Sequence, residues 1–521
     1  MQKTIQLKLL PQQASGDASI LSSIAETEAV PIENISGFTI LKRSIDARGR
    51  QAWINLKVLA YINEPAQPRE IQGFLFRDVS RADKKVIITG AGPAGLFAAL
   101  QLIELGIKPV VLERGKDVKS RRRDLAAMNK QGLVNPESNY CFGEGGAGTY
   151  SDGKLYTRSN KRGDIDRVLS LFVQFGAEEK ILYEAHPHIG TNKLPRIITA
   201  MREQIIDCGG DVLFEQKMVD LIINKETITG VKTQSGATID GDAVILATGH
   251  SARDIFHLLH HKNILIEAKP FALGVRAEHP QSLIDNAQYK CDSRGIYLPP
   301  ASYSLVQQVD QIGVFSFCMC PGGIIAPAAT SYNEIVVNGW SPSKRNNPYA
   351  NSGIVVQVQL ADIIKNQKSK NDPLALLHFQ QEVEKAAFIA GGGELKAPAQ
   401  RMVDFCTNKH SSTLPGCSYL PGITSSDLKT VLPPFIHRAL QKAFVEFGKK
   451  MRGYYTNEAV LVATESRTSS PVRIPRDNDT LQHPQIKNLY PCGEGAGYAG
   501  GIVSAAMDGE RVAKMIAAKI K

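Results

Sequence analysis

The chain has 521 residues, which is enough for about three domains. Hydrophobic residues make up 43 % and charged residues 21 %, as in ordinary globular proteins, and this excludes a wholly disordered chain. Lys and Arg exceed Asp and Glu by 10 (61 against 51), but the positive charge is spread along the chain. The densest basic run, residues 121–123, is followed at once by Asp124. We expect a mildly basic surface, and nucleic acid is not a favoured partner.

The chain contains no stretch of about 18 uninterrupted apolar residues, so no membrane-spanning helix is predicted. The first residues also lack the apolar core and cleavage site of a secretory signal. The eight cysteines are scattered and form no Cys-x-x-Cys. These features favour a reduced, cytoplasmic protein with neither a disulfide framework nor a metal site.

Residues 1–82 are predicted to form a small accessory α/β domain. Residues 5–9 alternate like a strand, residues 18–29 fit a helix, and residues 38–41 and 53–58 fit two more strands. No catalytic cluster is evident in this unit, so we expect a docking or accessory role.

Residues 84–113 carry the strongest local signal, a βαβ unit with a dinucleotide-binding fingerprint. The apolar strand at 86–88 leads into a Gly-rich turn that opens a helix from 96 to about 105, and the strand at 110–112 follows. The predicted cofactor-binding residues of this unit are Gly90, Gly92, Pro93, Ala94, Gly95, Glu113 and Arg114.

The glycines of this unit have separate roles. Gly90 allows the tight turn, Gly92 lets the backbone approach a pyrophosphate, and Gly95 lets the helix pack closely on the strand. The helix N-terminus offers N–H groups and partial positive charge to the phosphates. Glu113 can accept hydrogen bonds from ribose hydroxyls and would repel a 2′-phosphate.

Three later segments indicate FAD rather than NAD. The first is a Gly-rich loop at 141–154, with the candidate residues Gly145, Gly146, Ala147, Gly148, Thr149, Ser151, Asp152, Lys154 and Leu155. The second is the apolar strand at 243–249, which ends in Ala247, Thr248 and Gly249 and follows a hairpin near 231–239. Met218 and Val219 are added as candidates from the segment before that hairpin.

The third segment is the Gly-rich turn at 488–502, which opens a helix over 503–518. Its candidates are Gly493, Glu494, Gly500, Gly501 and Ile502. Glu494 is expected to bind ribityl hydroxyls, and the helix N-terminus to face the pyrimidine side of the flavin. FAD is longer than NAD, so its ribityl chain and ring need contacts that are distant in sequence.

Taken together, these motifs resemble the two-dinucleotide-binding FAD oxidoreductases. More closely, the chain resembles the uncharacterised bacterial FAD-dependent dehydrogenases, through residues 145–155, 269–280 and 465–477, and the likeness extends over essentially the whole chain. The resemblance implies a Rossmann-like FAD-binding domain with an inserted α+β substrate domain and a small N-terminal α/β domain. It implies no substrate. Glu494 departs from the wider flavoprotein pattern, in which Asp is usual.

We therefore predict the accessory domain at 1–82, the first part of the FAD-binding domain at 83–263, the inserted substrate domain at 264–455 and the C-terminal part of the FAD-binding domain at 456–521. The expected sheet strands of the insertion are 271–277 and 314–319, and 436–449 fits an amphipathic helix. If several basic residues converge in the predicted substrate pocket, the substrate is anionic or a nicotinamide dinucleotide docks there. The basic candidates are Arg276, Lys344, Arg345, Arg467 and Arg473.

No catalytic residue is identified by sequence, and the weak candidates are Cys320, Arg467 and Arg473. The turn after Cys320 could set this thiol against the flavin. A Cys-x-Cys pair can form a disulfide only with strain, and core packing or turn chemistry is the favoured explanation of the Cys-Met-Cys run. His250 is considered as a general acid or base against the alternative of a simple loop histidine. His257, His260 and His261 share a helix face but lack a partner motif for a metal.

The leading functional hypothesis is an FAD-dependent oxidoreductase that acts on a small molecule by hydride or electron transfer at the flavin. No second nucleotide-binding fingerprint is visible, so electrons could come from transiently bound NAD(P)H, from a protein electron carrier, or from the substrate itself. One alternative is a tRNA-modifying or other macromolecule-directed flavoprotein. Another is a flavin-binding protein without turnover.

Overall fold

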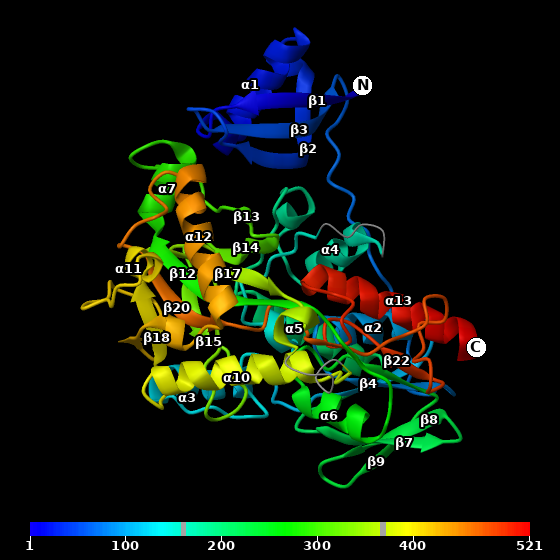
Figure 1. Cartoon of the computed structure of the whole chain (residues 1–521). Coiled ribbons are helices and arrows are strands. Elements are labelled where there is room, and N and C mark those ends of the chain that lie inside the picture. Colours follow the sequence, from blue (N-terminus) through cyan, green and yellow to red (C-terminus); the bar gives the residue numbers. More distant parts are fainter. Residues whose placement is uncertain (158–162, 365–370, 521) are drawn as a thin grey trace.

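The computed structural model describes residues 1–157, 163–364 and 371–520. The chain forms an N-terminal unit that stands apart from a larger body, and two sheets organise that body (Figure 1). None of the helices in these described ranges is long and apolar enough to cross a membrane.

The N-terminal unit is a three-stranded antiparallel sheet in the order β1-β3-β2, covered by one helix. Its elements are β1 (Gln2–Leu9), α1 (Asp17–Glu28), β2 (Ile35–Asp46) and β3 (Trp53–Ile62), so the predicted helix and strands are present. The buried side chains of Ile20 and Ile24 form the contact face of α1. The backbone of Arg43 exchanges hydrogen bonds with Tyr183 and Ala185, and these bonds attach β2 to the body of the molecule.

The FAD-type domain is built on a five-stranded parallel sheet in the order β22-β10-β4-β5-β6. Its strands are β4 (Lys85–Thr89), β5 (Lys108–Leu112), β6 (Asp211–Leu213), β10 (Ala243–Leu246) and β22 (Leu489–Pro491). Strands β4 and β10 are buried at nearly every position, as in parallel sheets covered on both faces. This sheet confirms the predicted Rossmann-like α/β fold. Pairing of β22 with β10 brings the C-terminal segment back beside the first βαβ unit.

Two helices from opposite ends of the chain pack together on this sheet. They are α2 (Pro93–Glu104) and α13 (Ile502–Ile520), which lie side by side in Figure 1. A Cβ on Gly509 would stand 2.1 Å from the carbonyl oxygen of Ala94, so glycine permits this close crossing. Other helices of this domain are α3 (Val118–Gln131), α4 (Ile165–Gln174), α5 (Leu194–Asp207) and α6 (Arg253–His261).

A small antiparallel sheet is inserted between β6 and β10. It consists of β7 (Met218–Asn224), β8 (Thr227–Thr233) and β9 (Thr238–Asp240), and it includes the hairpin expected near 231–239.

The inserted domain is organised by a seven-stranded sheet in the order β13-β14-β17-β12-β20-β18-β19. Its strands are β12 (Phe271–Pro280), β13 (Val306–Val309), β14 (Ile312–Cys320), β17 (Tyr349–Val358), β18 (Ala397–Arg401), β19 (Ile423–Ser425) and β20 (Val460–Glu465). The helices around it are α7 (Gln281–Tyr289), α8 (Leu360–Ile363), α10 (Ala375–Ala390), α11 (Met402–Cys406) and α12 (Pro434–Lys450). A hairpin of β15 (Ile324–Pro327) and β16 (Val337–Trp340) lies beside this sheet, and β11 (Glu267–Ala268) pairs with β21 (Val472–Arg473).

The end of the inserted domain differs from the predicted division of the chain. Strand β20 lies after residue 455, in the segment predicted to return to the FAD-binding domain, yet it pairs with β12 and β18. These pairings place β20 in the inserted sheet. A buried apolar strand of this kind carries no local signal that tells which sheet it will join.

Candidate cofactor site

A cavity of about 380 Å³ lies at the carboxyl ends of the parallel strands, where segments far apart in sequence meet. Most of the predicted cofactor residues are on its wall. They are Gly90, Gly92, Pro93, Ala94, Glu113, Arg114, Gly146, Ala147, Gly148, Ser151, Asp152, Lys154, Met218, Ala247, Thr248, Gly249, Gly493, Glu494, Gly500, Gly501 and Ile502. In open α/β sheets this edge is where nucleotides bind.

Five predicted residues do not line the cavity, namely Gly95, Gly145, Thr149, Leu155 and Val219. A Cβ on Gly95 would stand 1.9 Å from the carbonyl oxygen of Gly90, so Gly95 serves helix packing. The buried hydroxyl of Thr149 donates to the carbonyl of Glu144 at 2.7 Å and holds the Gly-rich loop from behind. Leu155 is buried in the core, and Val219 is exposed.

The first fingerprint turn is shaped for close approach to a ligand. The amide of Gly90 donates to the carbonyl of Leu112 at 2.7 Å, and α2 begins just after Gly92. The N–H groups of the first turn of a helix have no intrahelical partner, so those of α2 are available to an anion. A Cβ on Gly92 would meet only the Cα of Gly146, at 3.9 Å.

Glu113 organises the cavity wall more extensively than the fingerprint requires. Its buried carboxylate accepts N–H bonds from Ala91, Gly115 and Gly143, each at 2.9 Å. One carboxylate therefore connects the fingerprint turn, the end of β5 and the Gly-rich loop. Arg114, beside it, lies over the ring of Phe142 at 4.2 Å and forms ion pairs with Glu137 and Asp254.

Arg121 is a supporting residue that the sequence analysis placed in a basic surface run. Its guanidinium is fully buried and donates to the carbonyls of Asn139, Tyr140, Glu144 and Gly146 at 2.8–3.0 Å. Burial lowers the pKa of Arg121 from its usual value. The sequence singles out Arg121 only as part of the basic run 121–123 and assigns it no role at the cavity wall.

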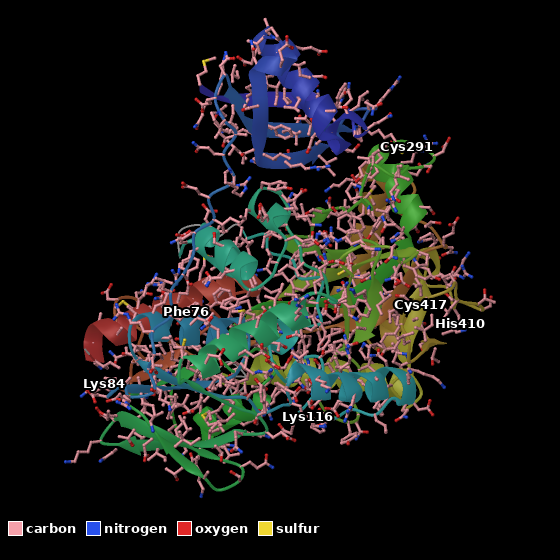
Figure 2. All side chains as sticks on the ribbon, turned by 180° about the vertical axis from the view of Figure 1, so that it is seen from behind. Phe76, Lys84, Lys116, Cys291, His410 and Cys417 are labelled. Carbon is pink, nitrogen blue, oxygen red and sulfur yellow. The ribbon has the colours of Figure 1, made fainter. Side chains whose placement is uncertain are left out.

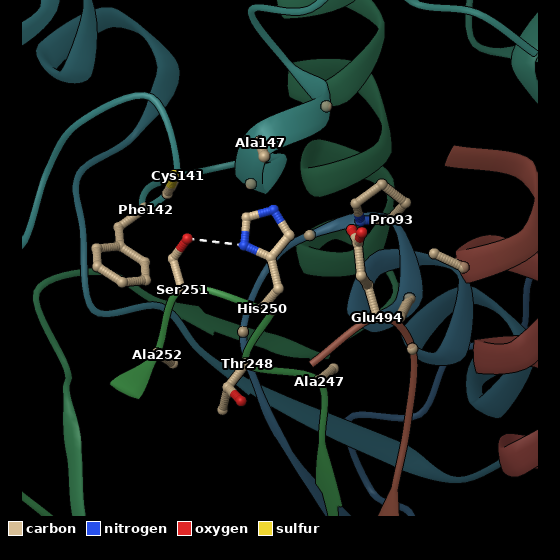
Figure 3. A pocket seen from close by; sticks show the side chains of 18 of the residues that line it. Pro93, Cys141, Phe142, Ala147, Ala247, Thr248, His250, Ser251, Ala252 and Glu494 are labelled. Carbon is tan, nitrogen blue, oxygen red and sulfur yellow. Dashed lines mark hydrogen bonds between the residues drawn. The ribbon is translucent and has the colours of Figure 1, made fainter. Parts of the chain in front are cut away.

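Two further polar side chains of the cavity wall are those of Thr248 and Glu494. The buried Oγ1 of Thr248 has no protein hydrogen-bond partner in the described part of the chain. Glu494 and Pro93 both line the cavity (Figure 3). Burial raises the pKa of Glu494 to about 7 against the opposing charge of Lys269. Carboxylate and hydroxyl oxygens are natural partners for several ligand hydroxyls. The cavity wall thus combines the N-terminus of α2 with the carboxylate of Glu494.

His250 projects into the cavity and is held by the Oγ of Ser251 at 2.7 Å (Figure 3). Burial and the nearby charges of Arg467 and Arg253 lower the pKa of His250 to about 3. Its imidazole is therefore neutral at physiological pH, and it acts as a hydrogen-bonding group rather than as an acid that is charged at rest.

The inserted domain completes the wall with Phe317, Cys318 and Asn338. Of the catalytic candidates, Cys320 is fully buried and lies behind Cys318, so the expectation that Cys320 faces the cavity is wrong. The reason is a bulge in β14 that period-2 alternation cannot anticipate. Arg473 does not line the cavity, and its guanidinium lies 5.6 Å from the ring of Tyr498.

Arg467 lines the cavity but is bound to carboxylates behind it. It forms ion pairs with Glu334 at 2.6 Å and Glu384 at 3.2 Å, and Arg253 contacts the same two acids. Burial alone would raise the pKa of Glu334, but Arg467 and Arg253 lower it to about 2. The network compensates the charge of Arg467 and fixes its position.

The expected convergence of basic residues on a substrate anion is not found. Arg276, Lys344, Arg345 and Arg473 are absent from the cavity wall. Arg276 is buried against Glu465 at 2.9 Å, and Arg345 is paired with Asp152 at 2.7 Å. The cationic wall residue of the loop is Lys154, whose Nζ lies 3.4 Å from Asp152.

Comparison with known proteins agrees with this geometry. The family described as "FAD-dependent protein, C-terminal domain-like" matches residues 270–468, an FAD binding domain matches 83–129, and "Glucose inhibited division protein A" matches 199–291. A domain of unknown function matches residues 1–61.

Three individual proteins illustrate what the chain is similar to. An "Uncharacterized protein" of Clostridium beijerinckii (strain ATCC 51743 / NCIMB 8052) is 39 % identical over 508 residues, covering 94 % of this chain and 93 % of the relative. A thiamine thiazole synthase of Methanococcus maripaludis (strain C5 / ATCC BAA-1333) is 28 % identical over 192 residues, 35 % of this chain and 61 % of that protein. The structure of 2,6-dihydroxypyridine-3-hydroxylase from Arthrobacter nicotinovorans matches with a TM-score of 0.38 at 10 % identity, covering 84 % of both chains.

The distant matches indicate no reaction, but the full-length relative and the matched FAD-dependent domains agree with the cavity and with the parallel sheet. The chain therefore belongs to a family of uncharacterised FAD-dependent proteins, and FAD is its cofactor.

Proposed function

We propose that the protein is an FAD-dependent oxidoreductase that transfers hydride or electrons between its flavin and a small-molecule substrate. One observation carries this proposal: the same cavity is bounded by the FAD motifs and by side chains of the inserted domain, Phe317, Cys318 and Asn338. A cofactor-binding domain alone would need no second domain at the cavity wall. Ligand sites are commonly formed at such domain boundaries.

FAD supplies the redox chemistry when it is bound, and the chain supplies binding, orientation and electrostatics. The first turn of α2 and Gly92 are suited to the diphosphate, Glu113 to the adenosine ribose, and Glu494 to the ribityl hydroxyls. The N-terminus of α13 is on the wall, where the amides of Gly500 and Gly501 donate to Ser504 Oγ at 3.2 and 3.1 Å.

Lys154 is the charged group that the Gly-rich loop contributes beside the inserted domain. It is held by Asp152, whose pKa Lys154 and Arg345 keep below its usual range although burial opposes this. A fixed positive charge here stabilises negative charge that develops on a substrate or on a reduced ring.

The test starts with the absorption spectrum of the purified protein, followed by anaerobic stopped-flow mixing with NADH and with NADPH. We expect a flavin spectrum that is bleached by a donor and restored by an acceptor. Lys154→Met should slow one of these half-reactions, whereas Lys344→Met, which removes a lysine outside the cavity wall, should not. A bound flavin that no chemical or enzymatic donor reduces would contradict the proposal.

A further inference from the structure

Strand β14 contains an irregularity that brings Cys318 to the cavity, with Cys320 directly behind it. Phe317 pairs with Gly353 of β17, but Cys320 pairs with Asn351, so two residues of β14 face one residue of β17. Cys318 has φ 46°, in the left-handed region that a side chain rarely adopts. The bulge turns Cys318 toward the cavity, while Cys320 stays buried behind it.

Both sulfur atoms point at the same ammonium group. The Nζ of Lys154 lies 3.6 Å from Cys318 Sγ and 3.6 Å from Cys320 Sγ. Cys320 Sγ is also 3.3 Å from the carbonyl oxygen of Cys318, and the two thiols are hydrogen-bonded to each other. Two cysteines that are separated by one residue thus share one cation and contact each other.

The charges around the pair favour one thiolate. The cations are Lys154, Arg276 and Arg345, and the carboxylates that pair with them are Asp152 and Glu465. Arg276 approaches the pair directly, with one nitrogen 3.4 Å from Cys320 Sγ and 2.7 Å from the carbonyl oxygen of Cys318. Three cations face two carboxylates, and burial raises the pKa of Glu465 to about 7, so the cluster holds an excess of positive charge that favours a thiolate.

We propose that Cys318 is a cavity-facing thiolate and that Cys320 is the buried thiol that closes a reversible disulfide with it. The site would take a small disulfide as its co-reactant. This proposal goes beyond the oxidoreductase function, because its chemistry takes place on sulfur atoms of the chain and does not require flavin turnover.

The protonation of the pair agrees with these roles. The hydrogen bond from Cys320 lowers the pKa of Cys318, and the charges of Lys154 and Arg276 add to this effect while burial opposes it. The pKa of Cys320 is raised, first by its hydrogen bond to Cys318 and then by burial. A thiolate is the form that attacks a disulfide, so Cys318 is the attacking sulfur and Cys320 the second to react.

The exchange balances in two steps. The Cys318 thiolate attacks one sulfur of a disulfide R–S–S–R, forms Cys318–S–S–R and releases R–S⁻. Cys320 then gives its proton to solvent water, attacks the Cys318 sulfur and releases the second R–S⁻. The two cysteine sulfurs are oxidised to one disulfide, and the small disulfide is reduced to two thiolates.

The first experiment measures the thiolate. The full-length protein, with its FAD, is alkylated with iodoacetamide between pH 5 and 9, and each cysteine is quantified by mass spectrometry. Cys291 is the internal reference, because it is also partly exposed and lies at the edge of the inserted domain near the N-terminal unit (Figure 2). At pH 6 we expect Cys318 to react at least about tenfold faster than Cys291, and Lys154→Met to reduce this advantage.

The second experiment tests whether Cys318 and Cys320 form a disulfide when the protein reacts with one molar equivalent of 4,4′-dithiodipyridine, and it follows the release of the two thiopyridine halves. The wild-type protein should release both halves of the probe rapidly and retain no mixed disulfide. Cys320→Ser should release one half and retain the other on Cys318, and Cys320→Ala gives the same readout if a buried hydroxyl disturbs folding. Cys318→Ser should lose the rapid phase, whereas Cys291→Ser should behave as the wild type.

Two results would overturn the proposal. If Cys318 reacts no faster than Cys291 at pH 6, it is not an activated thiolate. If the wild-type protein retains the mixed disulfide, Cys320 is not its partner. Neither result bears on flavin reduction, so failure here is distinguishable from failure of the oxidoreductase assignment.

Discussion

The backbones of Gly92 and Gly146 meet beside the phosphate-binding turn, where a Cβ on Gly146 would stand 3.2 Å from the Cα of Gly92. Each glycine belongs to a different Gly-rich motif, and both line the cavity. The two motifs therefore form one continuous part of the cavity wall, where we propose that FAD binds. Substitutions around this contact separate effects on packing from effects on FAD binding.

Gly95→Ala should damage the fold of the cofactor domain. The added Cβ would stand 1.9 Å from a backbone oxygen of Gly90, so α2 must shift. Overpacking of this kind lowers the free energy of unfolding by about 1–3 kcal/mol. Denaturant unfolding should therefore show a lower midpoint, and the purified protein should retain less FAD. Gly92→Ala is the matched control: its Cβ enters the cavity, so the stability of the FAD-free protein should change by less than about 0.5 kcal/mol while FAD binding weakens. Equal loss of stability in the two variants would contradict the assignment of separate roles.

Arg121→Met should destabilise the Gly-rich loop by several kcal/mol. The substitution removes the shared donor of four backbone carbonyls, two of them buried (Asn139 and Glu144) and two partly buried (Tyr140 and Gly146). Each unsatisfied buried group costs about 1–3 kcal/mol. We expect lower thermal stability and loss of bound FAD. Arg122→Ala removes the exposed neighbour and should change stability by less than about 0.5 kcal/mol. A stable Arg121→Met protein that retains FAD would show that water or other donors replace the guanidinium.

Glu278→Gln should flatten the pH dependence of stability. Glu278 is 1 % exposed and is bound by the amide of Ser418 at 2.7 Å, and burial raises its pKa to about 7, above the unfolded value of about 4.3. Between these values the folded protein binds the proton more tightly, so the contribution of Glu278 is fully present below pH 4.3 and is lost as the pH rises through 7. The loss is at most about 1.4 kcal/mol per pH unit in this window.

Urea unfolding at pH 5, 6, 7 and 8 measures this effect. The stability of Glu278→Gln relative to the wild type should rise with pH. Glu70→Gln, at an exposed position, should run parallel to the wild type. Parallel curves for Glu278→Gln as well would mean that this carboxyl titrates normally in the folded protein.

Arg467→Met should lower the free energy of unfolding by about 3–5 kcal/mol, because it removes a positive charge that faces two buried carboxylates. The pKa of Glu334, now about 2, should rise as Arg467 is removed. Arg467→Lys retains the charge but cannot reach all the acceptors of the guanidinium, so its loss of thermal stability should be smaller. Arg473→Met, outside the cavity wall, serves as the control. If Arg467→Met is as stable as that control, the network does not hold this part of the wall.

Local sequence was sufficient for much of the FAD site. The strand, glycine turn and helix around Gly90 and Gly92 form a self-contained unit, whose spacing predicts its geometry. The return of the C-terminal segment to the cofactor domain was also predicted, because the Gly-rich turn around Glu494 resembles a second nucleotide-binding turn. The pairing of β22 with β10 confirms this return. Both motifs could be predicted because their geometry depends on residues that are close together in sequence.

Tertiary structure alone decided the rest. Arg121 belongs to a run that reads as a solvated surface, and only the packing of the Gly-rich loop around it makes it a buried donor. A bulge in β14 against β17 decides that Cys318 rather than Cys320 faces the cavity. The charge of Arg467 is compensated by Glu334 and Glu384, which are distant in sequence. Burial, bulges and ion pairs arise from contacts between segments that are distant in sequence. A local sequence pattern therefore cannot show which distant residue a side chain will contact.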